Sequence, residues 1–484
     1  MNNKVIIALD QGSSSSRVLA FSARGEVLAR GSCPLETLRP QADMAEMDAW
    51  KLLTDQLNLL KEVLSNTNVG DVAALAVASQ RSTIVFWDKQ TGKPLAPVMS
   101  WQDGRAVKQA DSVSLSQQTI HQLTGLYKTP FYSAAKITWA LQHIPEVAQA
   151  AQAHRLCVGP TASYIIWHLT KGTVFACDAT LAQRMLLFNI QTGEWDETLL
   201  QAFGIEREWL PQIKRTVDDY GVYEYAGTKL PIRVCVGDQQ ASLFALRVEE
   251  GGACINYGTG GFFMRHTGAK CHLLPGMLTS VAATAADHTQ NAYILEGPVN
   301  ACATLFAWLS QIGFSIPVEQ LDTLYSTAKS PVWLLPALGG LGAPYWDFTA
   351  SVVISGLSAH TSKEDVAAGA VRGLAFVMAD IVFYAEQFGI KSEDIKVSGG
   401  LSQVHCLLQT QADILQKGLI PCVEKEGTAV GAALLAAQQV GIDTYAWETL
   451  RPLPKVSPTL EPQKATQLYA KWHHFVDWCK SQKS

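Results

Sequence analysis

Two turns rich in glycine and hydroxyl side chains, one near the start of the chain and one past its middle, constrain the fold most. The first turn, residues 10–17 (DQGSSSSR), lies between two apolar runs. The second, residues 257–261 (YGTGG), is flanked in the same way. Each pattern predicts a strand, a tight polar turn and another strand. Two such turns facing each other could hold the phosphates of one nucleotide from two sides, which predicts a two-lobed phosphotransferase.

The length of the chain predicts two domains, because 484 residues exceed what one hydrophobic core usually serves. A polar segment containing Gly251-Gly252 suits a hinge, so we expect a first domain over 1–247 and a second over 248–484. Both halves open with strand, turn and strand, a weak internal repeat. Strands and helices are mixed elsewhere, so the expected fold class is α/β: a duplicated domain with a central cleft.

Hydrophobic spacing predicts the elements that frame these turns. A three-stranded meander is expected over 4–33, and the stretch 362–388 has the clearest helical pattern. Ser362 and Asp365 have capping-box spacing, and Gly389 suits the position after the helix. The remaining predictions are helices at 49–65, 138–143, 161–168, from 238 onward, from 401 to 415 and at 428–439, and strands at 72–78, 83–88, 232–236 and 395–398.

Charge and cysteine usage exclude several classes of protein. A net charge of −5 argues against a nucleic-acid partner, which would need a basic face. The ten cysteines include no C-x-x-C pair, so neither a zinc site nor a disulfide framework is expected. No apolar run approaches the ~20 residues of a membrane span, and the run before Asp10 is too short for a signal peptide. We therefore expect a cytoplasmic protein with no membrane partner.

The first turn offers groups suited to a metal and a phosphate. Asp10 ends a buried strand, and its carboxylate could hold Mg²⁺ through water molecules. The amides that follow could bind an anion, and Arg17 adds a permanent positive charge. The alternative is a serine-rich turn with a solvated aspartate.

Two glycine-rich segments of the second half could bind the rest of a nucleotide. The hydroxyl of Thr259 and the amides around Gly260 suit a phosphate, and Gly399-Gly400 would let a flat base approach the backbone. The alternatives are an ordinary glycine hairpin and a tight turn that packs a helix on a sheet. Neither the first turn nor the second has the spacing of a P-loop.

A further acid, Asp238, follows the strand predicted at 232–236. Phosphorylation of an alcohol needs a group that orients the hydroxyl and accepts its proton, which predicts Asp238 as general base and Gln239 as a hydroxyl ligand. The alternative is an aspartate that only caps a helix.

Gln80-Arg81 also follows a buried strand and could bind sugar hydroxyls; the alternative is an ordinary exposed loop. The ring of Trp101 could line a carbohydrate or simply pack in the core.

Eight segments taken together resemble the FGGY carbohydrate kinases, and among them the glycerol kinases. The similarity spans nearly the whole chain in the expected order. The segments are ALDQGSSSSR (8–17), SQRSTIVFWDKQTGKPL (79–95), FYSAAKITWALQH (131–143), VGDQQASLFAL (236–246), NYGTGGF (256–262), LPALGGLGAPYWD (335–347), SGGLSQ (398–403) and EGTAVGAALLAA (426–437).

The resemblance implies two ribonuclease-H-like domains of the actin and hexokinase type, with ATP in the cleft between them. It implies Mg²⁺ at Asp10 and makes Asp238 the catalytic base. The implied ATP-binding residues are Ser13, Ser14, Arg17, Thr259, Gly260, Gly399 and Gly400. The implied substrate-binding positions are Gln80, Arg81, Ser82, Trp101, Phe131, Asp238, Gln239 and Phe262.

Two positions depart from the glycerol kinase pattern. Ser82 stands where a glutamate is usual, and Phe131 stands where a tyrosine is usual. A site built to pair a hydroxyl discriminates strongly when one partner is missing, so a different or larger polyol or ketose could fit. The motif at 101–105 (WQDGR) also occurs in pentulose kinases. Near the nucleoside, Val404 replaces a typical asparagine, which predicts looser base recognition.

The sequence thus predicts an ATP- and Mg²⁺-dependent kinase acting on a primary hydroxyl of a small polyol or sugar. A xylulose or ribulose kinase is the alternative within the family. An actin- or chaperone-like ATPase and a non-catalytic sugar sensor are the alternatives from other classes. The sensor would be expected to lose Asp10 or Asp238, and both are present. The oligomeric state stays open, with a homodimer and a homotetramer both compatible.

Overall fold

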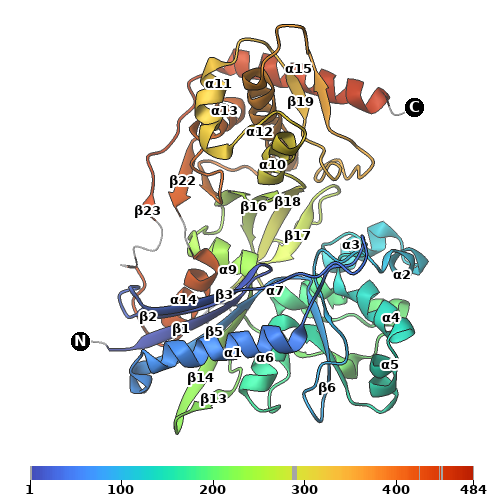
Figure 1. The fold of residues 1–484 in the computed structure, drawn as a ribbon, viewed down its shortest axis with the longest axis vertical. Coiled ribbons are helices and arrows are strands. Elements are labelled where there is room, and N and C mark those ends of the chain that lie inside the picture. Colours follow the sequence, from blue (N-terminus) through green and yellow to red (C-terminus); the bar gives the residue numbers. More distant parts are fainter. Residues whose placement is uncertain (1–2, 286–290, 424–425, 446, 448–450, 483–484) are drawn as a thin grey trace.

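The computed structural model describes residues 3–285, 291–423, 426–445, 447 and 451–482. The chain forms two lobes arranged along its longest axis (Figure 1). Each lobe is built on a mixed β-sheet flanked by helices, so the α/β class predicted from the sequence is confirmed.

The first lobe is built on a six-stranded sheet in the order β13-β14-β5-β1-β2-β3. The predicted meander forms its antiparallel half, because β1 pairs with β2 and β2 pairs with β3. Strands β5 and β14 then add in parallel to β1. The strands are β1 (Val5–Gln11), β2 (Ser15–Ser22), β3 (Val27–Pro34), β5 (Val72–Ser79), β13 (Val222–Tyr225) and β14 (Thr228–Gly237).

The second lobe repeats this plan in a seven-stranded sheet, ordered β17-β18-β16-β15-β21-β22-β23. Strands β18, β16 and β15 form an antiparallel meander, and β21 and β22 add in parallel to β15. The order β3-β2-β1-β5-β14 therefore corresponds to β18-β16-β15-β21-β22, which is the duplication expected from the two turns. The strands are β15 (Ala253–Tyr257), β16 (Gly261–Gly268), β17 (Leu278–Val281), β18 (Tyr293–Val299), β21 (Ile395–Ser398), β22 (Leu419–Val423) and β23 (Arg451–Pro452).

The other strands form small sheets. They are β4 (Glu46–Met47), β6 (Ile84–Asp88), β7 (Val98–Met99) and β8 (Leu156–Pro160) in one sheet, and the pairs β9 (Ala176–Asp178) with β12 (Gln212–Lys214), β10 (Phe188–Asn189) with β11 (Glu194–Trp195), and β19 (Trp333–Leu335) with β20 (Val353–Ser355).

Helices cover the sheets where the apolar spacing predicts them. The helix predicted at 49–65 has those bounds, and the one predicted at 362–388 spans Lys363–Gln387 with the expected capping box. The helix predicted directly after Gly400 begins only at His405. The helices are α1 (Ala49–Ser65), α2 (Val107–Ser112), α3 (Gln117–Thr124), α4 (Ser133–His143), α5 (Pro145–Gln152), α6 (Thr161–Leu169), α7 (Ala179–Ala182), α8 (Glu197–Phe203), α9 (Asp238–Ala245), α10 (Ala303–Gln311), α11 (Leu321–Thr327), α12 (Lys363–Gln387), α13 (His405–Leu415), α14 (Gly427–Gln439) and α15 (Pro462–Ser481).

Helix α14 follows β22 of the second sheet in the chain but packs on the first sheet. It lies beside α9 and packs against β1 and β5 (Figure 1), and its alanines share one apolar cluster with Ile6, Ala8 and Ala76. The contact is close, because a side chain on Gly431 would overlap the backbone of Ala241. The division at residue 247/248 stays a prediction, and α14 is a segment in which chain order and packing differ.

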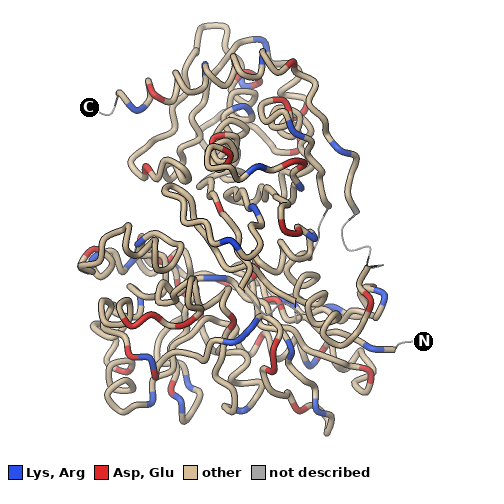
Figure 2. Tube along the Cα trace, turned by 180° about the vertical axis from the view of Figure 1, so that it is seen from behind, with Lys and Arg blue, Asp and Glu red and all other residues tan. Residues whose placement is uncertain are grey.

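Among the described residues one helix, α12, is long and apolar enough to cross a membrane by length and composition alone. However, 89% of its apolar window is buried inside the structure, where it forms the core of the second lobe. Lysines and arginines are interspersed with acidic residues over both lobes (Figure 2).

Candidate functional site

The predicted acids of the first lobe stand at the same edge of its sheet. In the register of the three central strands, Asp10 of β1 is level with Ala78 of β5, which is level with Val236 of β14. Asp10 is the penultimate residue of β1, and Asp238 directly follows β14, so both acids lie at the carboxyl ends of these strands. The carboxyl ends of parallel strands are the usual place for binding sites in open α/β sheets.

Asp10 is nearly buried, with 4% of its surface exposed, and lies near three charged groups. Burial raises the pKa of its carboxyl group to about 7, the charge of Arg17 opposes this rise, and the charges of Asp238 and Glu426 add to it. Arg17 Nη1 lies 3.6 Å from Asp10 Oδ2 and 3.2 Å from Glu426 Oε2, which precedes α14. The two predicted acids therefore interact electrostatically.

The first turn is held by Gln80 as well as by its own backbone. The Gly12 amide donates to the Ser15 carbonyl at 3.0 Å. Gln80 Nε2 donates to the Gly12 carbonyl at 3.1 Å and lies 3.2 Å from Gln11 Oε1, and Gln80 Oε1 accepts from Thr83 Oγ1 at 2.8 Å. Since Gln80 is 1% exposed, its amide already serves to fix the turn, and its predicted contact with a substrate stays a prediction. Ser13 and Ser14 lie in the turn itself, and Ser14 is exposed.

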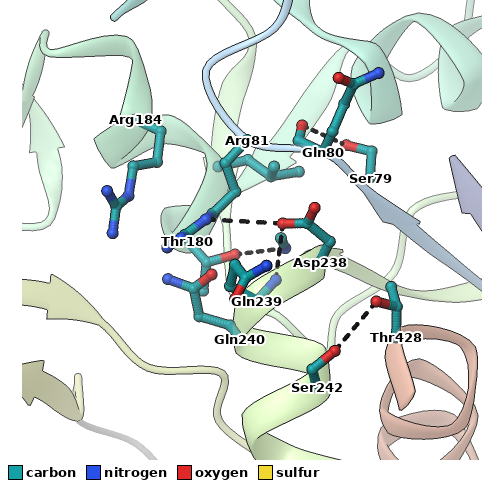
Figure 3. Close-up of polar contacts among 12 residues, drawn as sticks. Ser79, Gln80, Arg81, Thr180, Arg184, Asp238, Gln239, Gln240, Ser242 and Thr428 are labelled. Carbon is teal, nitrogen blue, oxygen red and sulfur yellow. Dashed lines mark hydrogen bonds and ion pairs between the residues drawn. The ribbon is translucent and has the colours of Figure 1, made fainter. Parts of the chain in front are cut away.

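Asp238 is the first residue of α9, and Gly237 is the N-cap, so Asp238 is not the capping residue that the alternative required. Its Oδ1 accepts from the Gln239 amide at 2.8 Å and lies 3.7 Å from Arg81 Nε (Figure 3). Burial raises the pKa of its carboxyl group, and the charge of Arg81 opposes the rise. The side chain still has 24% of its surface exposed, so it can reach a ligand.

A hydroxyl group fixes the backbone just before Asp238. The Gly237 amide donates to Thr180 Oγ1 at 2.8 Å, and the Thr180 hydroxyl lies 2.8 Å from both oxygens of buried Asp178. Burial raises the pKa of Asp178 to about 7, against the hydrogen bonds that it accepts. Because Asp178 accepts the hydrogen bond that the Thr180 hydroxyl donates, the oxygen of that hydroxyl is free to accept one from the Gly237 amide. Thr180 and Asp178 thus fix the backbone immediately before Asp238.

Arg81 also reaches across to the second lobe. Its Nη1 lies 3.2 Å from Oε1 of Glu296 on β18, and Arg184 Nη2 lies 2.6 Å from Oε2 of the same carboxylate. Tyr132 hydrogen-bonds to Arg184. The sequence motifs predicted Arg81 at the substrate, but they did not point to Glu296, Arg184 or Tyr132.

The remaining substrate positions lie on loops around this cluster. Ser82 has a φ of +63°, and Lys136, which is fully buried on α4, donates to the carbonyls of Ser82 at 3.1 Å and Ser100 at 2.6 Å. Lys136 therefore ties the loop after β5 to the loop that carries Trp101. The rings of Trp101 and Phe131 are 43% and 46% exposed, so neither is the core aromatic that the alternative for Trp101 required.

The motif at 101–105 holds its own loop together. Arg105 donates to Asp103 through Nε at 2.8 Å and through Nη2 at 2.6 Å, and the Ala45 amide donates to Asp103 at 2.7 Å. Asp103 is fully buried. These two residues therefore fix the loop that carries Trp101.

In the second lobe the nucleotide candidates also meet at one sheet edge. Asn256 of β15 is level with Ser398 of β21, so the second turn and Gly399-Gly400 are neighbours. Gly399 has a φ of +91°, and a Cβ there would lie 2.5 Å from the Tyr257 carbonyl oxygen, whereas a Cβ on Gly400 would meet open space.

The second turn is anchored to the start of α10. The Cys302 amide donates to the Thr259 carbonyl at 2.8 Å, and a Cβ on Gly260 would lie 2.8 Å from the Val299 carbonyl oxygen. Thr259 itself is exposed, and Phe262 is half-buried at the start of β16. The structure thus gathers the predicted residues into one set in each lobe, and their binding roles stay predictions.

The residues that the sequence motifs did not point to still carried a recognisable signal. Glu296 interrupts the apolar strand Tyr293–Val299, and Lys136 lies on a buried face of α4. A charged residue in an apolar segment is rarely buried without a partner. That rule marks such residues as members of a polar cluster, although it does not say which partner they find.

Comparison with known proteins identifies the class to which this fold and site belong. The N-terminal domain of the FGGY family of carbohydrate kinases matches residues 5–245, and the C-terminal domain of that family matches residues 253–440. The chain belongs to the FGGY family of carbohydrate kinases, and it is a kinase. The family assignment favours the kinase over the ATPase and sensor alternatives.

Individual relatives agree with this assignment. The chain is 36% identical over 453 residues to a glycerol kinase of Shewanella frigidimarina, covering 91% of this chain and 90% of the relative. It is 34% identical to a glycerol kinase of Pseudothermotoga lettingae, covering 98% of each. The structure of Plasmodium falciparum glycerol kinase with ADP superposes with a TM-score of 0.92 at 26% identity, covering 98% of each chain. A xylulose kinase from Rhodospirillum rubrum has the same fold, with a TM-score of 0.88 at 21% identity over 99% of each chain.

Proposed function

We propose that this kinase transfers the γ-phosphoryl group of ATP to a primary hydroxyl of a small polyol or sugar, with Asp238 as general base. The observation that carries the proposal is the placement of Asp10 and Asp238. The two carboxylates follow parallel strands of one sheet and influence each other's charge. One acid can therefore serve the phosphate side of a single site while the other serves the hydroxyl side.

The residues of the first lobe suit the acceptor. Asp238 accepts the proton of the hydroxyl as the phosphoryl group transfers, and Arg81, 3.7 Å away, favours the ionised carboxylate that can accept it. Gln239, Trp101 and Phe131 are accessible around it. An exposed ring at such a position suits the apolar face of a carbohydrate.

The glycines of the second lobe suit the nucleotide. The hydroxyl of Thr259 and the amides of its turn would bind phosphate oxygens, and the open space over Gly400 would admit the nucleoside. Arg17 would bind phosphate in place of the acidic groups that it pairs with here. ATP would then lie between the phosphate turns of the two lobes.

The residues around Asp10 fit a hydrated Mg²⁺ ion. Magnesium usually takes one or two carboxylates and completes its shell with water and phosphate oxygens. Asp10 provides such a carboxylate; burial raises its pKa to about 7, and the charge of Arg17 opposes this rise only in part. When bound, the ion would neutralise charge on the transferring phosphate.

Glycerol is one candidate acceptor, and a ketopentose or pentitol is the second. The relatives named glycerol kinase support glycerol. The larger acceptors are favoured by Phe131, whose exposed ring carries no hydroxyl, and by the small side chain at Ser82. A hydroxyl-binding group that is missing from the wall would weaken binding of a triol more than of a substrate with further hydroxyls.

A screen of acceptors tests the proposal. ATP consumption would be measured at fixed Mg²⁺ with glycerol, tetritols, pentitols and ketopentoses, each against a control without acceptor. We expect at least one acceptor to stimulate ADP formation, with the phosphorylated product detected by mass spectrometry. ATP hydrolysis that no acceptor stimulates would contradict the proposed function. The rank of glycerol against xylulose decides between the two candidates.

A further inference from the structure

Glu296 is an almost completely buried charged group near the candidate site, with 1% of its surface exposed. It lies on β18 of the second lobe, but both cations that pair with it come from the first lobe. Arg81 lies 3.2 Å from one oxygen and Arg184 lies 2.6 Å from the other. Burial alone would raise the pKa of Glu296, and the two guanidinium groups lower it to about 2. It is therefore ionised throughout the physiological range.

This carboxylate links the second lobe to the proposed base through one side chain. Arg81 is shared, because its Nη1 faces Glu296 while its Nε faces Asp238 at 3.7 Å. Figure 3 shows Arg81 directed at Asp238, with Arg184 on the far side of Arg81. The Arg81 side chain is 9% exposed, so it has little freedom to leave this arrangement.

We propose that Glu296 is a positioning residue for the proposed phosphoryl transfer. It holds Arg81 beside Asp238, so that the second lobe sets the charge state and the alignment of the base in the first. This inference rests on the proposed function. It also implies that the base is correctly set only while the two lobes are in contact.

The signs of the electrostatic effects make the proposal testable. The charged groups that face Asp238 are Arg81 and Arg184, which lower its pKa, and Glu296, which raises it. Asp10 also interacts with Asp238 electrostatically. Tyr132 adds a hydrogen bond to Arg184. Glu296→Gln removes a negative charge and leaves two cations near the base. Arg184→Met removes a cation and leaves the carboxylate.

The test is the acid limb of the pH profile of kcat/KM, measured with glycerol or D-xylulose, whichever the screen supports. We expect Glu296→Gln to move this limb to lower pH by roughly one unit, and Arg184→Met to move it to higher pH. Glu296→Gln should also raise the acceptor KM, because Arg81 stays near Asp238 but loses the ion pair with Glu296 that fixes its orientation. Two shifts of the same sign, or no shift, would overturn the proposal.

Asp380→Asn is the matched control. Asp380 is a buried carboxylate of the second lobe, 4% exposed, and its partners Tyr469 and Trp472 lie on α15 at the far end of the molecule (Figure 1). Its loss should lower the melting temperature without moving the acid limb. A merely structural role for Glu296 would give Glu296→Gln the same behaviour.

A second variant and a second readout keep the test decisive if Glu296→Gln does not fold. The double variant Glu296→Gln/Arg184→Met removes one charge of each sign, so the acid limb should stay near that of the wild type while the acceptor KM rises. The Asp238 carboxyl can also be titrated directly by ¹³C NMR, with its signal assigned by loss in Asp238→Asn. That titration needs no turnover, so failure of the proposed function and failure of this inference are distinguishable.

Discussion

The two lobes share a sheet order but differ in the residues that come after their parallel strands. In the first lobe, β1, β5 and β14 lead into Asp10, Gln80-Arg81 and Asp238, which are charged or polar. In the second lobe, β15 and β21 lead into the turn 258–260 and into Gly399-Gly400. The same sheet order therefore carries charged and polar side chains in the first lobe and mainly glycine residues in the second.

The difference has a physical basis in what each lobe is proposed to bind. An acceptor hydroxyl must be oriented and deprotonated, which needs directed side chains held by second groups such as Thr180. A nucleotide presents phosphates and a flat base, for which backbone amides and open space are sufficient. At Gly260 in the second turn, and at Gly399 beside it, the surrounding backbone leaves no room for a side chain. Substitutions in the two lobes should consequently have different effects on the protein.

The largest effect is expected from Asp238→Asn in the first lobe. Loss of the general base should lower kcat by roughly 10²- to 10⁴-fold, while binding of a non-hydrolysable ATP analogue stays near that of the wild type. Steady-state kinetics and calorimetry of the analogue measure the two parts. Asp55→Asn, which only breaks an exposed pair with Lys51, should leave both unchanged. A near-wild-type kcat in Asp238→Asn would contradict the proposed division of roles, in which the first lobe provides the general base.

The next effect is a pH dependence of stability that arises from Asp10. Its pKa is about 7 in the folded protein and about 3.9 when unfolded, so the folded state binds the proton more tightly between these values. Stability from this group is present at low pH and is lost as pH rises towards 7. Asp10→Asn cannot ionise, so it should gain on the wild type between pH 4 and 7 by up to about 4 kcal/mol. Urea unfolding of both proteins at several pH values measures this difference.

A carboxylate of the second lobe provides the contrast. Asp365 accepts from the backbone amides of Ser362, Lys329 and Ser330, and these bonds hold its pKa below the ordinary value. Its contribution to stability is therefore present above pH 4 and is lost only below. The difference between Asp365→Asn and wild type should be constant from pH 5 to 8. If the stability difference from the wild type depended on pH in the same way for Asp10→Asn and Asp365→Asn over that range, the raised pKa assigned to Asp10 would be contradicted.

Gly399→Ala is the corresponding test of the second lobe. A Cβ at a φ of +91° is strained and would overlap the Tyr257 backbone, which must shift the adjoining turn. A cost of ~1–2 kcal/mol predicts that the KM for ATP rises roughly tenfold, with the acceptor KM little changed. Gly389→Ala is the control, because its φ is +79° but no atom lies within 4 Å and it only ends α12. It should lower stability by about 1 kcal/mol without altering the KM for ATP. An equal rise in both KM values for Gly399→Ala would show that the lobes do not divide the two ligands.

The lobes also differ in how much of them could be predicted from the sequence. The meander, α1, α12 and β21 were predictable because local patterns determine them: apolar spacing, caps and turn residues. The strand ends likewise placed Asp10 and Asp238 at an edge. The register that makes these two neighbours depends on β5 lying between β1 and β14, which is a long-range pairing.

The least predictable feature was the contact between the lobes. Glu296 and Arg81 are separated by 215 positions in the chain, and no local pattern joins them. Gln80 is a related case, since its position after a strand is predictable but its bonds to Gln11 and Gly12 are not. Side-chain partners of this kind follow from the tertiary packing, which hydrophobic periodicity does not encode.

The smallest expected effect concerns α14, which belongs to the second half by chain order and to the first lobe by packing. Its Thr428 hydroxyl lies 3.2 Å from the Ser242 hydroxyl of α9, and its alanines pack against β1 and β5. Thr428→Val keeps the shape of the side chain but removes this hydrogen bond, so it should lower the free energy of unfolding by about 1 kcal/mol. Thr466→Val on α15, which removes an exposed bond to Pro462, is the control for a hydroxyl lost outside the contact. Hydrogen exchange locates the effect: protection should fall in β1 and β5 and stay unchanged in β15 and β21. If protection fell in the second sheet instead, chain order rather than packing would define the cooperative unit, and α14 would have to be assigned to the second lobe.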